Sequence, residues 1–106
     1  MLVVTSPDIP GKKIVKTLGI VKGNTIRARH IGKDILAAFK NIVGGEIQEY
    51  TKLMAESREQ AIDRMIESAE QMGANAIIST ITTTSVISQG AAELLVLGTA
   101  VVIEDE

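Results

Sequence analysis

The 106-residue sequence predicts a single α+β domain, residues 1–106, with an antiparallel sheet of about four strands, one long helix and one short helix. Three observations predict this fold. A long amphipathic run covers residues 46–72, β-prone runs lie before and after it, and no internal repeat or low-complexity linker divides the chain. Strands at both ends with helices between them are typical of helices packed on an antiparallel sheet.

Two strands are expected before the helices. Residues 2–5 form a short β-prone run, and residues 6–11 are dense in turn formers. From Lys13 onward successive side chains point to opposite faces of a second strand, with Ile14, Leu18 and Ile20 together on one of them. We expect this strand to pair antiparallel with the first. Residues 22–25 fit either a turn or a continuation of the strand past a bulge.

Helical spacing of apolar residues predicts a short helix over 33–43, which Gly44 and Gly45 end. In the long helix, acidic residues gather opposite an apolar stripe that is roughly 100° wide. Gly73 ends this helix because glycine adopts a left-handed conformation without a Cβ clash. The stripe contains Ile47, Tyr50, Met54, Ala61, Met65, Ala69 and Met72.

Two more strands follow the long helix. Residues 76–87 are rich in Ile and Thr, which suits a strand with one rather polar face. Residues 88–90 supply a turn, and residues 94–103 form a last strand that is apolar on both faces. One helix covers only one face of the sheet, so the sequence predicts that a second copy of the chain covers the other.

Composition excludes several function classes. The net charge of −2 and the 2% aromatic content argue against a nucleic-acid partner, which needs basic and stacking surfaces. The chain has no cysteine, which excludes disulfides, thiolate metal sites and thiol catalysis. No segment approaches the roughly 20 apolar residues that span a bilayer. We therefore expect a cytoplasmic protein with no membrane partner.

Arg58 is the most informative single residue, because the helical spacing places it in the middle of the apolar stripe. A charge there is costly unless it is paired. Arg58 either forms a structural pair or anchors an anion or ligand in a cavity of an oligomer. Leu53 and Ile66 lie on the two flanks of the stripe, either as ordinary exposed apolar residues or as contacts between subunits.

The remaining candidates carry weaker signals. His30 is the only histidine, so a transition-metal site would need carboxylates such as Glu46 or Glu49 as further ligands. Gly44 and Gly45 before a helix resemble half of a phosphate-binding turn, but Glu46 would repel an anion. No Ser-His-Asp, Cys-His or paired-carboxylate arrangement emerges from the sequence.

Four ordered motifs resemble the YbjQ-like family of small bacterial and archaeal proteins. They are residues 41–46 with Tyr50, residues 58–61, residues 73–77 and residues 98–101. The resemblance implies a dodecin-like α+β fold whose subunits assemble into a ring, with a pentamer as the expected form. Such a ring agrees with the cover that the last strand needs.

The resemblance implies no catalytic role and no cofactor. It carries over Gly44, Gly45, Glu46, Tyr50 and Arg58 as an inter-subunit site. Our leading hypothesis is a non-enzymatic, ring-forming homo-oligomer that binds a small ligand between subunits. The alternative is a heavy-metal-binding protein, a label that the family carries, with His30 or helix carboxylates as ligands. An enzyme built on the Gly-Gly-Glu and Tyr cluster is the third hypothesis.

Overall fold

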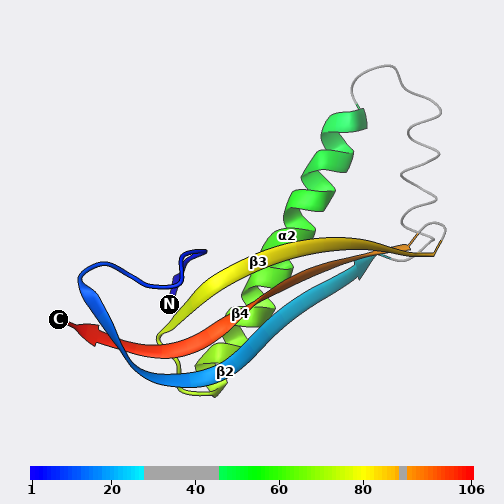
Figure 1. The fold of residues 1–106 in the computed structure, drawn as a ribbon. Coiled ribbons are helices and arrows are strands. Elements are labelled where there is room, and N and C mark those ends of the chain that lie inside the picture. The colour runs from blue at the N-terminus through cyan, green and yellow to red at the C-terminus, as the bar shows by residue number, and fades with distance from the viewer. Residues whose placement is uncertain (28–45, 89–90) are drawn as a thin grey trace.

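A computed structural model describes residues 1–27, 46–88 and 91–106 of the chain. Four strands form one sheet, and the helix α2 (Glu46–Gln71) packs on one face of it (Figure 1). The strands are β1 (Leu2–Val3), β2 (Lys12–Arg27), β3 (Ala76–Ser88) and β4 (Ala91–Asp105), in the spatial order β1-β3-β4-β2. The predicted α+β fold with a four-stranded sheet and a long helix is confirmed. The short helix predicted over 33–43 lies outside the described residues.

The expected pairing of the first two strands is wrong. β1 pairs in parallel with β3, with Leu2 opposite Ala76, so the sheet is mixed rather than antiparallel. The turn-rich segment 4–11 carries the chain across the end of the sheet, and β2 begins at the opposite edge beside the end of β4. A segment of this length allows that crossing, whereas a tight hairpin turn would have held the two strands together.

β2 runs unbroken through residues 22–25, so these residues continue the strand rather than form a turn. Its register against β4 shifts twice, between Ile14 and Lys16 and between Thr17 and Gly19. The shifts break the alternation of side chains that the sequence suggested. As a result, Leu18 packs against the core beneath the helix, whereas Ile20 is exposed.

The main core lies between α2 and the middle of the sheet. Ala61, Met65 and Ala69 are fully buried there, which confirms the central part of the predicted stripe. They pack with a set of buried sheet residues, namely Val21, Ile77, Val96 and Ala100. Small side chains on the helix let its backbone approach the sheet closely, and α2 lies mainly over β2 and β4.

A second, smaller cluster lies on the other face of the sheet. Ala76, Ile78 and Val101 are buried in it, and Val4 and Ile9 of the N-terminal segment pack against them. The chain therefore covers one end of its second sheet face with its own N-terminus. The expectation that a single subunit has no second cover is wrong for this end.

The chain is elongated. Its principal-axis extents are 56 × 24 × 17 Å and its radius of gyration is 17.1 Å, against about 13 Å for a compact domain of this length. In the described part of the chain, no helix is long and apolar enough to cross a membrane.

Candidate functional site

Beyond the N-terminal segment, none of the described elements covers the sheet face opposite α2. Paired residues on neighbouring strands share a face, and Ile20 is opposite Thr99 while Ile81 is opposite Leu97. Ile20 is 77% exposed and Ile81 is 53% exposed. We call this region the open face, and it comprises Ile20, Lys22, Asn24, Ile26, Ile81, Thr83, Leu95 and Leu97.

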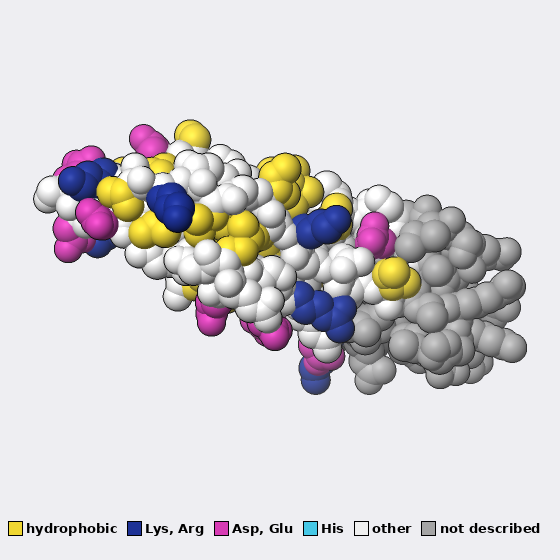
Figure 2. Space-filling view, turned by 90° about the horizontal axis from the view of Figure 1, so that it is seen from below, with side chains coloured by type: hydrophobic (Ala, Val, Ile, Leu, Met, Phe, Trp, Pro, Cys, Tyr) yellow, Lys and Arg dark blue, Asp and Glu magenta, His cyan; other side chains and the backbone are white. Residues whose placement is uncertain are grey.

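The open face is apolar in its middle and polar at its rim. Half-buried Leu95 and Leu97 lie on the central strand β4 between the exposed isoleucines of β2 and β3. At the rim, the Asn24 amide Nδ2 donates a hydrogen bond of 3.0 Å to Glu93 Oε2. Figure 2 shows several hydrophobic side chains in the middle of one side of the molecule, with charged side chains between and around them. An apolar sheet surface of this kind is suited to covering by another protein surface.

Arg58 is exposed, so the prediction that it lies in the middle of the buried stripe is wrong. The buried line along α2 runs at four-residue steps through Ser57, Ala61, Met65 and Ala69. Each such step advances about 40° around the helix axis, because one residue turns about 100°. Near the start of this line, Ser57 and Ala61 face the sheet, and Arg58 lies beside them on the flank.

The other site residues of the helix lie near its beginning. Gly44 and Gly45 are outside the described residues, and Glu46 and Tyr50 lie in the first turns of α2, with their side chains outside the described part. Glu46 and Arg58 are twelve positions apart, which is about 18 Å along a helix axis. A single chain therefore does not bring these two residues together on one small ligand.

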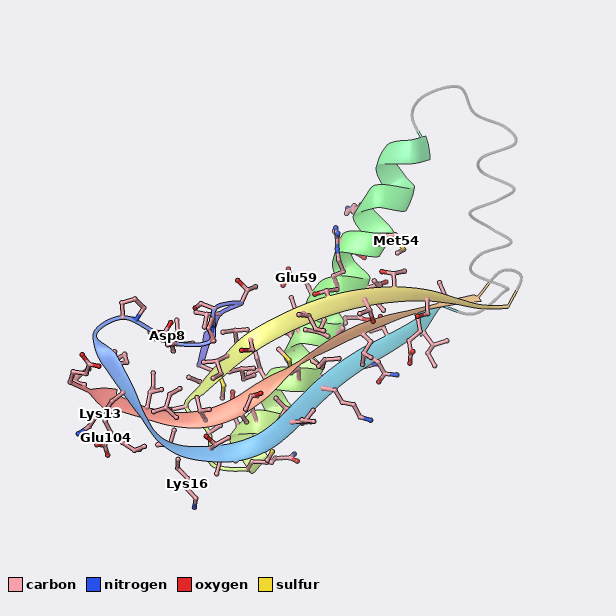
Figure 3. The ribbon with its side chains drawn as sticks, viewed as in Figure 1. Asp8, Lys13, Lys16, Met54, Glu59 and Glu104 are labelled. Carbon is pink, nitrogen blue, oxygen red and sulfur yellow. The ribbon has the colours of Figure 1, made fainter. Side chains whose placement is uncertain are left out.

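The flanks of α2 differ in character. Met54 is half-buried and Glu59 is exposed, and the two point to different sides of the helix (Figure 3). Ile66 is half-buried and packs against the main core, whereas the side chain of Leu53 lies outside the described part. The solvent side of the helix carries the exposed acidic residues, namely Glu56, Glu59, Asp63, Glu67 and Glu70.

Two of the sequence motifs have a folding role. In the 73–77 motif, Gly73 has a φ of 88°, and the Asn75 side chain makes two hydrogen bonds with the backbone of Ile103. Asn75 Nδ2 donates to Ile103 O at 2.9 Å, and Ile103 N donates to Asn75 Oδ1 at 2.7 Å. In the 98–101 motif, a Cβ at Gly98 would lie 2.6 Å from Ile77 Cγ2. The strand packing therefore requires glycine there.

Sequence reasoning missed a β-bulge in β3. Ile78 is opposite Thr99 and Ile81 is opposite Leu97, so both lie on the sheet face away from α2, and the register shifts between them. Ser79 has a φ of 52°, and the buried Thr80 Oγ1 has no hydrogen-bond partner in the described part of the chain. The three-residue spacing of the two isoleucines was an available signal, because a regular strand puts residues i and i+3 on opposite faces.

Charged side chains gather at the end of the sheet where β2 begins and β4 ends. Lys12 forms an ion pair with Asp105, and Lys13 is opposite Glu104 (Figure 3). The hydrogen bond from Lys12, together with its positive charge, lowers the pKa of the Asp105 carboxyl below its usual value. Both side chains are exposed, so this pair contributes little to stability.

The residues the structure describes offer no metal centre. Within 1–27, 46–88 and 91–106, no group of three or more His, Cys, Asp or Glu side chains lies close enough together to hold a metal ion. His30 lies outside these ranges.

Comparisons with known proteins agree on one family. Residues 1–104 match the YbjQ family model, which is described as "Putative heavy-metal-binding". A UPF0145 protein of Clostridioides difficile is 55% identical over 100% of this chain and 95% of its own length. A UPF0145 protein of Pyrococcus furiosus is 51% identical over 100% of this chain and 93% of its own length. These names state no enzymatic activity.

A solved structure is similar in fold. It is a protein of unknown function from Pediococcus pentosaceus in the DUF74 family, with a TM-score of 0.56 and 18% sequence identity. The match covers 100% of this chain and 98% of that one. With a family match along almost its whole length and relatives at about half identity, the chain belongs to the YbjQ family of UPF0145 proteins.

Proposed function

We propose that the protein works as a non-enzymatic homo-oligomer that forms a ring and binds a small ligand between its subunits. The open face is the observation that supports this proposal. Ile20 and Ile81 on the open face are largely exposed in the single subunit. Burial of an aliphatic side chain of this size contributes roughly 1.5–3 kcal/mol, which favours a partner surface.

The surface area of the subunit also supports assembly. The chain exposes 6859 Å², whereas a folded monomer of 11.3 kDa is expected to expose about 5,700 Å². The resemblance of the motifs to a ring-forming family makes a pentamer the expected form.

The ligand site of the proposal comprises Gly44, Gly45, Glu46, Tyr50 and Arg58. Arg58 is exposed on the flank of α2 and about 18 Å along the helix from Glu46. A site that uses both ends of this set therefore combines the helix start of one subunit with the Arg58 flank of another. Such a site would exist only in the assembled form.

The assembly is tested by Ile20→Asp in size-exclusion chromatography. We expect the variant to elute as a smaller species while its circular dichroism stays unchanged, because Ile20 is exposed in the subunit and covered only in the assembly. Ser68→Asp, at an exposed position of the helix, introduces the same residue and should leave the elution unchanged. An Ile20→Asp protein of native size would remove the open face from the proposal.

The ligand is tested by native mass spectrometry of protein purified from its own source. We expect a small molecule that stays with the oligomer and is lost in Arg58→Ala. An oligomer that carries no added mass would contradict ligand binding and leave self-assembly intact.

Heavy-metal binding is the alternative, and its support is the description of the family model. Titration with divalent metal ions in a calorimeter tests it. Saturable binding that is lost in His30→Ala or Glu46→Gln would favour this alternative, and no saturable binding would end it. The proposed location is the cytoplasm, with which a chain without cysteine is compatible.

A further inference from the structure

Arg58 lies on the flank of α2 that faces β4 and β3. Six positions separate it from Arg64, so the two arginines are about 120° apart around the helix axis. Arg64 Nη1 donates to Asn24 O of β2 at 2.6 Å, which shows that the Arg64 flank faces the β2 side of the sheet. In the described sheet β2 is the outermost strand on that side, with β4 and then β3 beyond it. The Arg58 flank is therefore on the side of β4 and β3.

Thr84 of β3 lies at the same level of the sheet as Arg58 and on the same face. The link runs through Ser57, the residue before Arg58, whose backbone O accepts a hydrogen bond of 3.2 Å from Thr25 Oγ1. Thr25 is opposite Leu94 of β4, and Leu94 is opposite Thr84. Residues directly opposite one another on neighbouring strands share a face of the sheet. Thr84 is therefore on the helix side, two strands away from Thr25.

Thr82 is on the same face, because it is two positions from Thr84 in the same strand. It is opposite Val96, which is fully buried in the main core under α2. The helix lies mainly over β2 and β4, and both threonines remain exposed. Two exposed hydroxyl groups therefore lie on the helix side of the sheet, beyond the strand that the helix covers.

The Arg58 guanidinium has no acidic partner in the described part of the chain, where the one ion pair joins Lys12 and Asp105. A carboxylate three or four positions away on a helix could pair with it, but all four of these positions are apolar. They are Met54, Ala55, Ala61 and Ile62. β3 contributes no charged residue either. This side of the described structure therefore carries an unpaired positive charge next to hydroxyl groups.

We propose that Arg58 binds one oxyanion group of a small molecule, a carboxylate or a phosphate, and that Thr82 and Thr84 donate hydrogen bonds to the same group. We call these three residues the anion site. The inference rests on the proposed ligand binding and names the chemical class of the ligand. A guanidinium presents a planar fork of donors that matches a carboxylate or phosphate. A threonine hydroxyl supplies a further donor to the remaining oxygen.

A cation fits this flank poorly. Arg58 would repel it, and neither β3 nor the apolar helix positions around Arg58 supply a carboxylate to bind it. The heavy-metal alternative therefore has no support at the anion site.

Isothermal titration calorimetry of the full chain tests the proposal. The probes are inorganic phosphate and succinate, each titrated at constant ionic strength in a chloride buffer. We expect saturable binding of at least one probe, with one molecule per chain. A response to phosphate alone would identify a phosphate-bearing ligand, and a response to succinate alone a carboxylate.

Three variants locate the binding. Arg58→Gln should weaken it by roughly ten- to a hundredfold, because hydrogen bonds to a charged group are lost. Thr84→Val keeps the shape of the side chain and loses the hydroxyl, so it should weaken binding by roughly two- to tenfold. Arg64→Gln removes the same charge from the other flank of α2 and is the matched control, which should bind the probe as the wild type does. Circular dichroism checks that each variant is folded.

The outcomes separate this inference from the proposed function. A wild-type protein that carries a small molecule in native mass spectrometry but binds neither probe would overturn the anion site and leave ligand binding standing. Equal losses in Arg58→Gln and Arg64→Gln would also overturn it, in favour of general charge attraction. If neither probe binds and Arg58→Gln breaks up the oligomer, Arg58 pairs with a carboxylate of a neighbouring copy instead. Probe binding by a protein that carries no ligand from its own source would contradict the proposed function and leave the anion site standing.

Discussion

Gly23 brings the backbone of β2 close to the backbone of α2. A Cβ at this position would lie 2.0 Å from Ala61 O and 2.5 Å from Met65 N, which are backbone atoms of the helix. Two hydrogen bonds flank the contact: Thr25 Oγ1 donates to Ser57 O at 3.2 Å, and Arg64 Nη1 donates to Asn24 O at 2.6 Å. β2 and α2 are therefore fixed to one another through backbone contact as well as through apolar side chains.

We expect Gly23→Ala to lower the free energy of unfolding by at least about 1–3 kcal/mol, because the added methyl group must displace the helix backbone. Urea denaturation measures the change. Ser68→Ala, an exposed position on the same helix, should change the free energy by less than about 0.5 kcal/mol. Equal stability of Gly23→Ala and the wild type would contradict the close contact.

Asn75 joins the turn after α2 to the end of β4. Asn75→Ala removes both hydrogen bonds to Ile103, and we expect a loss of about 1–2 kcal/mol in the free energy of unfolding. Asn75→Asp keeps the acceptor for Ile103 N and loses the donor to Ile103 O, so its stability should lie between that of the wild type and that of Asn75→Ala. If both variants matched the wild type in urea denaturation, the side chain would have no such role.

Asp105 should titrate below its ordinary range. Its pKa is lowered in the folded state, so the pair with Lys12 stabilises the fold above the unfolded pKa of about 3.9, and this contribution is lost as the pH falls through the folded pKa. We expect an NMR titration to give Asp105 a pKa below the ordinary value of an aspartate and a higher pKa in Lys12→Met. An unchanged value in the variant would argue against the ion pair.

Among the elements, α2 was the most predictable from the sequence. Its helical period and its end near Gly73 depend on neighbours within a few positions. The same spacing predicted the buried residues Ala61, Met65 and Ala69. The sequence wrongly predicted that Arg58 lies in the buried stripe. The angle at which α2 crosses the sheet decides which side of each helical turn is buried, and the sequence of the helix alone does not give that angle. That crossing depends on Gly23, which lies far away in the chain.

We expect Met65→Ala to lower the free energy of unfolding by about 2–5 kcal/mol, because Met65 is fully buried between α2 and the sheet. Met54→Ala, at a half-buried position nearer the helix start, should cost less. Thermal or urea denaturation of both variants checks the order. A larger loss for Met54→Ala would move the centre of the core toward the helix start.

The strands show the limit of local reasoning. Composition located all four strands. The pairing of β1 with β3 could not be predicted, because it depends on both segments together and not on the residues of either one alone. The two register shifts of β2 likewise depend on β4. The candidate site was predictable only in part: Glu46, Tyr50 and Arg58 all lie on α2, but the exposure of Arg58 depends on where the sheet covers the helix.

For the whole molecule, the apolar last strand was the most informative feature of the sequence. Its helix side is buried under α2, and one end of its other side is covered by the N-terminal segment. The rest of that side is the open face, and within residues 1–27, 46–88 and 91–106 no further strand pairs at its two borders. Ring formation and the pentamer stay predictions.

Self-assembly is tested most directly by the molar mass of the full chain, measured by light scattering across a dilution series. Because the described residues leave the open face uncovered, we expect a constant mass that is a multiple of the chain mass of 11.3 kDa, five-fold if the protein is a pentamer. A mass of one subunit at every concentration would contradict self-assembly and, with it, the proposed function.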